Sequence, residues 1–210
     1  MSSFACQSTE DEALRRELLI EAVGPAIIFL ALWLDGWFYP LLLLPFLYVI
    51  LVEKKTISWL GFRKQELKPS ISLGLLTATL LMAIHYPIFM QYIPLLEKTA
   101  SSLYDLFTDV VWYPLYEETA YRSFLLVHFA DFRTSSFTKR NLLLNSLQAV
   151  LFLSIHRQHV VSGRPLVLVT VLVLALVNGL VFLKTRNISG CILSHCAING
   201  FALFLRGAYI

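Results

Sequence analysis

The sequence predicts an all-α polytopic membrane protein, a bundle of about seven (six to eight) transmembrane helices that encloses a polar cavity. Of its 210 residues, 57% are hydrophobic and 15% are charged, whereas a typical soluble domain carries about 25% charged residues. The mean hydropathy is +0.68, and disorder requires low hydrophobicity. This composition therefore argues against both a soluble enzyme and a disordered chain.

The apolar runs that predict the helices lack the strict alternation of barrel strands. Most approach or exceed the length of about 20 residues that a membrane-spanning helix needs. Asp35-Gly36 is a turn signal, so the first two runs are expected to form a helical hairpin. In chain order, the runs cover residues 18–34, 37–52, 71–93, 101–130, 141–156, 165–183 and 188–206.

The positions of Lys and Arg predict the orientation, because cytoplasmic loops carry an excess of both. With the N-terminus inside, the inner group is the larger one: Arg15, Arg16, Lys54, Lys55, Arg63, Lys64, Lys68, Arg133, Lys139, Arg140, Lys184 and Arg186. The outer group contains Lys98, Arg157, Arg164 and Arg206. We therefore predict a multi-pass protein of the cell (plasma) membrane with a cytoplasmic N-terminus. The net charge of +3, without a dense basic stripe, argues against nucleic-acid binding.

The fourth apolar run contains three ionisable residues, Glu117, Glu118 and Arg122. Each costs about 2.5–3.5 kcal/mol at the centre of a membrane helix, so partners within the bundle are expected. Arg122 follows Glu118 by four residues, the favourable spacing for an ion pair on a helix. Glu117 lies about 140° from Arg122 around the helix, on the side of Tyr121, and is free to face a neighbouring helix. A purely architectural pair would explain Glu118 and Arg122 but not Glu117.

The fifth and seventh runs supply polar partners for Glu117. Asn145, Gln148, Phe152 and His156 form one stripe about 80° wide on the fifth run. In the seventh run His195 and Asn199 share one face, and both can donate hydrogen bonds. Taken alone, each histidine is more often a core or interfacial residue than a catalyst. Asn178-Gly179 in the sixth run indicates close helix packing with one hydrogen bond.

Together these helices offer a carboxylate base, an imidazole that orients or binds water, and two donors for a developing oxyanion. This set suits attack of an activated water on an amide carbonyl, and no Ser or Cys lies in an obvious nucleophile setting. Two other classes stay open. Membrane carboxylates and histidines also mark transporters and proton relays, although inverted repeats are missing. A non-catalytic immunity or scaffold protein could keep the same fold.

Three motifs occur in order along the chain: Glu117-Glu118-x-x-x-Arg122, Phe152-x-x-x-His156 and His195-x-x-x-Asn199. With Trp59-Leu-Gly-Phe-Arg63 upstream, the chain resembles the CPBP (CAAX protease and bacteriocin-processing, Abi) family over about residues 55–205. This family includes the type II CAAX prenyl endopeptidases. The family commonly has Gly after the motif arginine, where this chain has Ser123, a difference expected to affect packing more than chemistry.

The resemblance implies an intramembrane endopeptidase in which Glu117 and His156 activate water, while His195 and Asn199 form the oxyanion hole. Glu118, Arg122, Tyr121 and Phe152 would support them. The family has been described both as metalloproteases and as glutamate-dependent proteases. A zinc ion would be held by Glu117, His156 and His195, with Cys191 as a fourth ligand. We favour the glutamate mechanism without a metal cofactor, because zinc would leave Asn199 and the Glu118–Arg122 pair without obvious roles.

The expected organisation is a single integral membrane domain whose partners are the lipid bilayer and a peptide or membrane-protein substrate. Measured from the predicted inner ends of the helices, a rise of 1.5 Å per residue places Glu117 and His156 roughly 20–25 Å deep in the membrane. The same rise places His195 only about 10 Å deep. Either the helices are strongly tilted or the turn before the seventh run lies deeper than assumed. The parts of the domain (1–210) are a polar N-terminal segment at 1–17, a basic loop at 53–69 and the catalytic helices at 101–206.

Overall fold

The computed structural model describes residues 15–34, 43–92, 103–132, 136–161 and 165–205. Within these ranges every regular element is a helix and no strand occurs, as the sequence predicts. The predicted turn at Asp35-Gly36 and residues 1–14 of the predicted N-terminal segment lie outside the described residues.

Each predicted apolar run is helical over most of its described residues, and most boundaries agree to within a few residues. The first half of the chain forms η1 (Leu19–Val23), α2 (Gly24–Leu34), α3 (Leu43–Leu47), η3 (Tyr48–Val52), η4 (Ile57–Leu60) and α4 (Leu67–Tyr92). The second half forms α5 (Leu103–Phe107), η6 (Thr108–Trp112), α6 (Tyr113–Glu118), η7 (Thr119–Leu125), α7 (Leu126–Phe129), α8 (Lys139–Ile155), α9 (Gln158–Val161), α10 (Val167–Thr185) and α11 (Ser189–Leu205).

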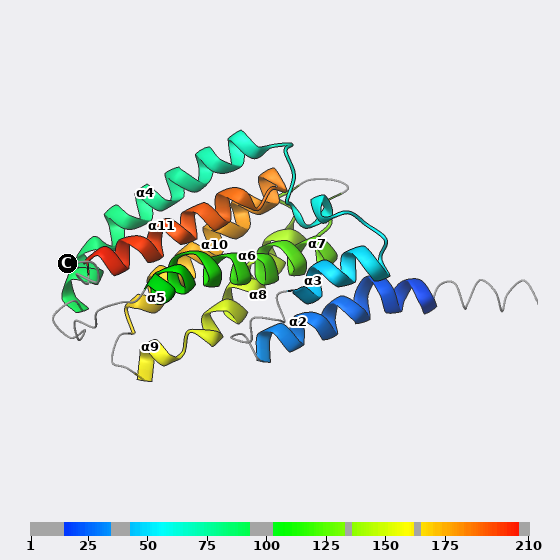
Figure 1. Ribbon diagram of the computed structural model, residues 1–210, viewed down its shortest axis with the longest axis horizontal. Coiled ribbons are helices and arrows are strands. Elements are labelled where there is room, and N and C mark those ends of the chain that lie inside the picture. The colour runs from blue at the N-terminus through cyan, green and yellow to red at the C-terminus, as the bar shows by residue number, and fades with distance from the viewer. Residues whose placement is uncertain (1–14, 35–42, 93–102, 133–135, 162–164, 206–210) are drawn as a thin grey trace, which may run out of the picture.

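The helices α4, α10 and α11 run side by side along the long axis of the molecule (Figure 1). Glycines allow α4 and α11 to approach closely. A Cβ atom on Gly190 would lie 1.9 Å from the backbone oxygen of Ser70, and one on Gly74 would lie 2.2 Å from that of Gly190. Both distances are far below van der Waals contact, so any side chain at Gly74 or Gly190 would push the two helices apart.

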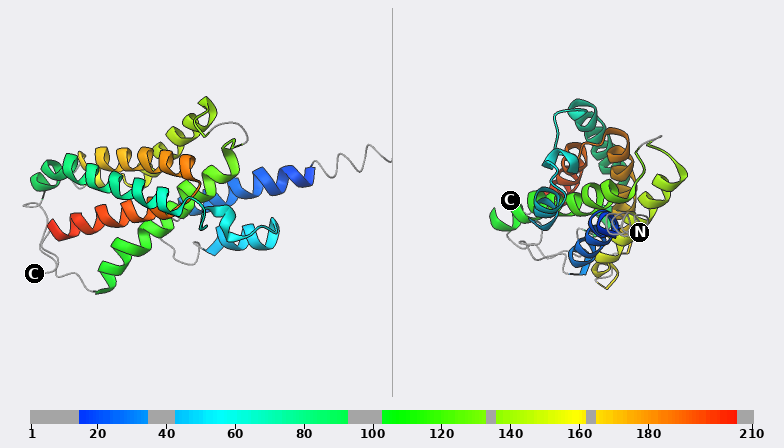
Figure 2. Two further views of the ribbon diagram at one scale, coloured as in Figure 1. Left: turned by 90° about the horizontal axis from the view of Figure 1, so that it is seen from above. Right: turned by 90° about the vertical axis from the view of Figure 1, so that its right-hand side faces the viewer.

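The stretch from α5 to α7 is one continuous helix that crosses this layer obliquely, with α2 and α3 near its carboxyl end (Figure 2). It changes pitch twice, because η6 and η7 are π-helical with wider turns than the α-helix. Such π segments are rare and are frequent at functional sites. The short α-helical segment α6, which carries Glu117 and Glu118, lies between them.

By length and composition, two helices in the described part of the chain could cross a membrane, Leu67–Met90 and Val167–Thr185. Leu43–Val52 and Ser189–Leu205 are apolar but shorter. The other predicted spans form helices that are also shorter or, in the case of α5 to α7, contain the charged residues discussed below.

The turn between α10 and α11 lies inside the protein rather than at a free end. Asn187 is fully buried, and its side-chain amide donates to the backbone carbonyls of Arg63 (2.6 Å) and Gln65 (2.9 Å). The amide of Ile188 donates to the carbonyl of Gly61 at 3.2 Å. Since the loop around residues 61–65 covers this turn, α11 begins within the protein, and the depth of His195 in the bilayer stays a prediction.

Ser123, at the position where the resembled family commonly has Gly, joins η7 to η4. Its side chain is fully buried and its hydroxyl donates to the backbone carbonyl of Leu60. The hydroxyl thus satisfies a buried carbonyl, which is a packing role of the kind expected for this difference.

Candidate active site

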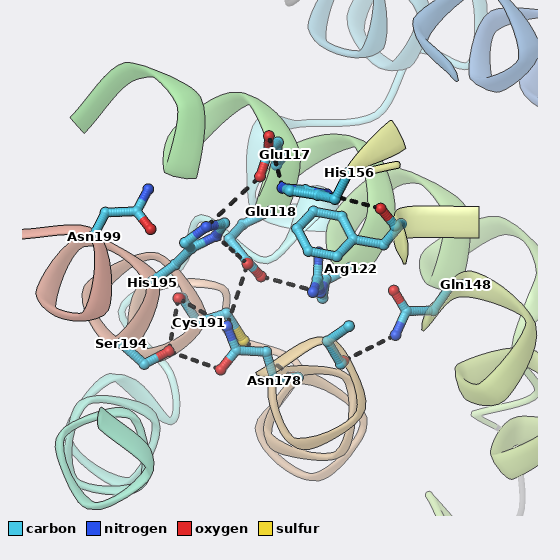
Figure 3. A network of polar contacts seen from close by, with 12 residues as sticks. Glu117, Glu118, Arg122, Gln148, His156, Asn178, Cys191, Ser194, His195 and Asn199 are labelled. Carbon is cyan, nitrogen blue, oxygen red and sulfur yellow. Dashed lines mark hydrogen bonds and ion pairs between the residues drawn. The ribbon is translucent and has the colours of Figure 1, made fainter. Parts of the chain in front are cut away.

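The two adjacent glutamates of α6 are both buried but point in different directions (Figure 3). Glu117 is 4% exposed and lines a cavity, whereas Glu118 and Arg122 have no exposed surface at all. Arg122 Nε lies 3.3 Å from Glu118 Oε2, so the ion pair predicted from the i,i+4 spacing is present. The guanidinium also lies 4.2 Å from the centre of the Phe152 ring. In a buried setting such a cation–π contact contributes about 2 kcal/mol.

Glu118 has a second role that the spacing along its own helix did not predict. Its Oε1 lies 2.8 Å from Nδ1 of His195 on α11 and accepts from Nδ2 of Asn178 on α10 at 3.2 Å. One carboxylate therefore joins three helices, and it fixes the orientation of the His195 ring. A carboxylate on one nitrogen of a histidine is a common device for setting which nitrogen faces a reacting group.

Glu117 lies between two imidazole rings (Figure 3). Its Oε1 is 4.0 Å from Nε2 of His156, and its Oε2 is 3.6 Å from Nε2 of His195. Both separations exceed a normal hydrogen-bond length. The three side chains therefore converge from α6, α8 and α11 as the sequence predicts, and the gaps leave room for a small polar molecule.

Hydrogen bonding assigns the tautomer of His156. Its Nδ1 lies 2.9 Å from the backbone carbonyl of Phe152, and a carbonyl oxygen can only accept. The proton of neutral His156 is therefore on Nδ1, and Nε2 directs a lone pair toward Glu117. His156 ends α8 as its capping residue, with φ −91° and ψ 11°, which places the ring at the cavity wall.

The cavity has a volume of about 270 Å³. Its walls are mainly apolar, and the polar groups gather where Glu117, His156 and His195 meet. The residues that line it are Phe89, Asp109, Tyr113, Glu117, Phe152, His156, His159, Val167, Thr170, Val171, Leu174, His195, Ile198, Asn199, Ala202 and Leu203. An apolar cavity with a few convergent polar groups is the usual form of a small binding or catalytic site.

The remaining predicted residues lie at or behind this wall. Asn199 lines the cavity, and its Nδ2 donates to the backbone carbonyl of Asp109 at 2.8 Å. Phe152 packs against the rings of His156 and His195, with centroid distances of 4.6 and 6.0 Å. Tyr121 is absent from the cavity lining and packs in the core, edge-on to Phe29 and Phe152.

Asn178 is the residue whose importance the sequence understated. Besides its bond to Glu118, its Nδ2 donates to the carbonyl of Cys191 at 3.1 Å, and its Oδ1 accepts from the Ser194 hydroxyl at 2.7 Å. The one hydrogen bond expected is in fact a network that holds α10 against α11 behind His195. The sequence did contain a signal for this network: Asn178 is an isolated amide side chain in an otherwise apolar run, and polar residues in membrane helices are often functional.

Cys191, considered as a fourth zinc ligand, is fully buried, and its Sγ donates to the backbone carbonyl of Asn178 at 3.2 Å. In the described part of the chain, no three His, Cys, Asp or Glu side chains are grouped closely enough to hold a metal ion.

The fold and the site define a helical, largely apolar protein with a carboxylate–imidazole cluster at the wall of a partly open cavity. Residues 99–201, about half of the chain, match the family described as type II CAAX prenyl endopeptidase Rce1-like. The chain belongs to this CAAX-protease (CPBP) family of membrane-embedded peptide hydrolases. The matched range contains every residue of the cluster. No curated protein and no solved structure shows significant similarity to the chain.

Proposed function

We propose that this protease is a glutamic-type intramembrane endopeptidase that hydrolyses a peptide bond with a water molecule activated by Glu117 and His156. The observation that carries the proposal is the position of the Glu117 carboxylate between two imidazole Nε2 atoms, 4.0 and 3.6 Å away, at the wall of the cavity. The substrate class that follows from the family is a peptide or a membrane protein.

The geometry suits a water held between Glu117 Oε1 and His156 Nε2. A water about 2.8 Å from each atom would form normal hydrogen bonds, with an angle of about 90° between them. Both atoms would accept a hydrogen bond from the water, since the His156 tautomer presents a lone pair at Nε2. The lone pairs on the water oxygen would then face the substrate carbonyl, which is the arrangement that a nucleophile needs.

In the proposed reaction, Glu117 takes one proton from the water while the water oxygen bonds to the carbonyl carbon of the substrate. The π electrons move to the carbonyl oxygen, which becomes an oxyanion held by His195 Nε2–H and by the Asn199 amide. Asn199 has two N–H groups, and we assign the one that does not bond to Asp109 to this role. The carbon–nitrogen bond then breaks as the carbonyl re-forms, Glu117 returns its proton to the leaving amine, and a carboxylic acid and an amine are released; the acid then loses its remaining proton to solvent.

The role proposed for His195 requires a proton on both ring nitrogens, because Nδ1 already faces Glu118 and only Nε2 is directed toward Glu117 and the cavity. With neutral histidines, the two carboxylates and one guanidinium of the buried cluster carry a net charge of −1. An uncompensated buried charge is costly, so one additional proton is expected in the cluster. On His195 this proton makes both ring nitrogens donors, with Nδ1 bonded to Glu118 and Nε2 directed toward Glu117 and the cavity.

For the whole chain we propose a multi-pass bundle of about seven helices with a cytoplasmic N-terminus, on the basis of the apolar runs and the inner excess of Lys and Arg. We propose one integral membrane domain, with the N-terminal segment 1–17 and the basic loop 53–69 outside the bilayer and the catalytic helices within 101–206. We further propose that the enzyme has no resident cofactor. Zinc is the alternative, for which Glu117, His156 and His195 would be the ligands.

The decisive experiment compares wild-type enzyme with Glu117→Gln after reconstitution into liposomes with a peptide library, with products identified by mass spectrometry. Loss of general-base catalysis lowers rates by about 10²–10⁴-fold, so Glu117→Gln should lose detectable cleavage while melting close to the wild-type temperature. Glu66→Gln, an exposed carboxylate in the basic loop, is the matched control and should cleave normally. Full activity in Glu117→Gln would disprove the proposed base.

The same preparation distinguishes the zinc alternative. We expect cleavage to persist in 1,10-phenanthroline and elemental analysis to find no stoichiometric metal. Activity that is lost in the chelator and restored by zinc would replace the glutamate mechanism with the metal-dependent one.

A further inference from the structure

One wall of the catalytic cavity is a stripe of α10 formed by Val167, Thr170, Val171 and Leu174. These positions are three and four residues apart, so they lie on one face of the helix. Three of the four side chains are aliphatic. Thr170, which is 4% exposed, is the polar one.

The hydroxyl of Thr170 is buried and has no hydrogen-bond partner within the described part of the chain. Other buried helical threonines satisfy theirs locally: the hydroxyls of Thr77, Thr108 and Thr185 each donate to the carbonyl four residues earlier, at 2.8 to 2.9 Å. Thr119 also lacks a partner there but does not line the cavity. Thr170 thus combines an unsatisfied hydroxyl with a place in the cavity wall, and an unsatisfied buried hydroxyl carries a desolvation penalty that a bound ligand can remove.

We propose that Thr170 is a substrate-binding residue whose hydroxyl forms a hydrogen bond with a main-chain group of the peptide in the cavity. This inference rests on the proposed function and names the substrate conformation: an unwound, extended segment with aliphatic side chains. In an α-helix the main-chain groups are bonded to one another, so an interior helical turn offers no free partner for Thr170. An extended segment offers both its N–H and its C=O groups.

The rest of the wall fits such a segment. Val171, Leu174 and Ile198 provide apolar contact for alternate side chains, while Glu117 lies in the same cavity and faces the bond to be cleaved. Threonine populates two χ1 rotamers in helices. The hydroxyl oxygen of Thr170 is itself buried in the ligand-free protein, so binding requires a χ1 rotation that exchanges the hydroxyl and methyl positions and brings the hydroxyl to the bound main chain.

The test compares Thr170→Val, which has the same shape without the hydroxyl, with Thr170→Ser, which keeps it. Thr77→Val on α4 is the matched control, because its hydroxyl bonds within its own helix and it lies outside the cavity. The probe is an acetylated, amidated and dansyl-labelled aliphatic peptide selected as a wild-type substrate. Its dissociation constant is measured for each variant in a Glu117→Gln background, and kcat/KM is measured in the otherwise wild-type enzyme.

We expect Thr170→Val to weaken peptide binding and to lower kcat/KM by about 5–10-fold, the usual size of one hydrogen bond. Its melting temperature should not fall, because the lost hydroxyl has no hydrogen-bond partner among the described residues. Thr170→Ser should recover most of the loss, and Thr77→Val should leave binding unchanged.

Unchanged binding and kcat/KM in Thr170→Val would overturn the inference. A peptide locked into a helix by a side-chain staple should bind at least 10-fold more weakly than its linear parent, and equal binding would refute the extended-substrate assignment. The binding constant is measured without turnover, so the two proposals can fail separately. If the protein bound peptides through Thr170 but never cleaved them, the proposed protease function would be disproved and the role of Thr170 would stand. If no library peptide is cleaved, the probe is the dansylated aliphatic peptide that the Glu117→Gln protein binds most tightly.

Discussion

Replacing Arg122 with Met should destabilise the protein strongly, because it removes one partner of a fully buried ion pair. Both side chains are 0% exposed, and Arg122 Nε lies 3.3 Å from Glu118 Oε2. Breaking such a pair costs about 3–5 kcal/mol, since it leaves an uncompensated charge in the interior. A typical domain is stable by about 5–15 kcal/mol, so the variant should lose about a fifth or more of that stability. Methionine keeps an apolar side chain at this position but also loses the guanidinium contact with the Phe152 ring, so the destabilisation includes the loss of that cation–π contact.

The double variant Glu118→Gln/Arg122→Met tests the cause. It removes both charges, and replacing a whole buried ion pair with neutral groups is often close to neutral in free energy. We expect it to be at least about 2 kcal/mol more stable than Arg122→Met alone. It should nevertheless stay slow in catalysis, because the ionised carboxylate that orients His195 is missing.

The assay is reversible unfolding in mixed micelles, followed by tryptophan fluorescence. Arg140→Met is the control: this arginine is exposed and bonds to a backbone carbonyl of α7, so its loss should stay within about 0.5 kcal/mol. The explanation by an uncompensated buried charge would be refuted if Arg122→Met unfolded like the wild type. It would also be refuted if the double variant were no more stable than Arg122→Met alone.

Three further predictions concern the contacts that hold the helices around the site. Gly190→Ala should lower the unfolding free energy by about 1–3 kcal/mol because its Cβ would lie 1.9 Å from a backbone oxygen of α4; Gly200→Ala on the same helix has its nearest neighbour at 3.7 Å and should melt normally. Equal melting of both variants would count against the close approach of α4 and α11. Asn178→Leu should lower the unfolding free energy by about 1–3 kcal/mol and also reduce kcat, since it leaves polar groups behind the site unpaired. If neither the unfolding free energy nor kcat fell, the network would not have the proposed role. Ser123→Ala should lower the melting temperature, for a loss of about 1 kcal/mol, while kcat/KM stays unchanged, and a selective loss of activity would show that this hydroxyl acts in catalysis.

The features that the sequence predicted well are those set by neighbours in the chain. The ion pair between Glu118 and Arg122 follows from the geometry of one helix, although η7 is π-helical. The convergence of Glu117, His156 and His195 could be predicted because each is costly in an apolar run and because together they match an ordered set of motifs. The helical character of every described apolar run follows from its length and lack of alternation.

The features that escaped prediction depend on how helices are rotated and shifted relative to one another. The bond from Glu118 to His195 requires α6 and α11 to present their inner faces at one level, which no spacing within either helix determines. The burial of the turn before α11 depends on a loop more than a hundred residues earlier. Tyr121 was predicted to support the site from the Glu117 side of the helix, and the structure places its ring edge-on to Phe29 and Phe152, outside the cavity lining.

Asn187 also bears on where the folding unit of this protein begins. The matched family range starts at residue 99, but the amide of Asn187 is satisfied by carbonyls of the preceding loop, and its own carbonyl accepts from the Ser70 hydroxyl at 2.8 Å. A fragment cut at residue 99 would expose these groups and the glycine face of α11. Family similarity and autonomous folding therefore have different boundaries in this chain, and a shortened version should keep the basic loop and α4.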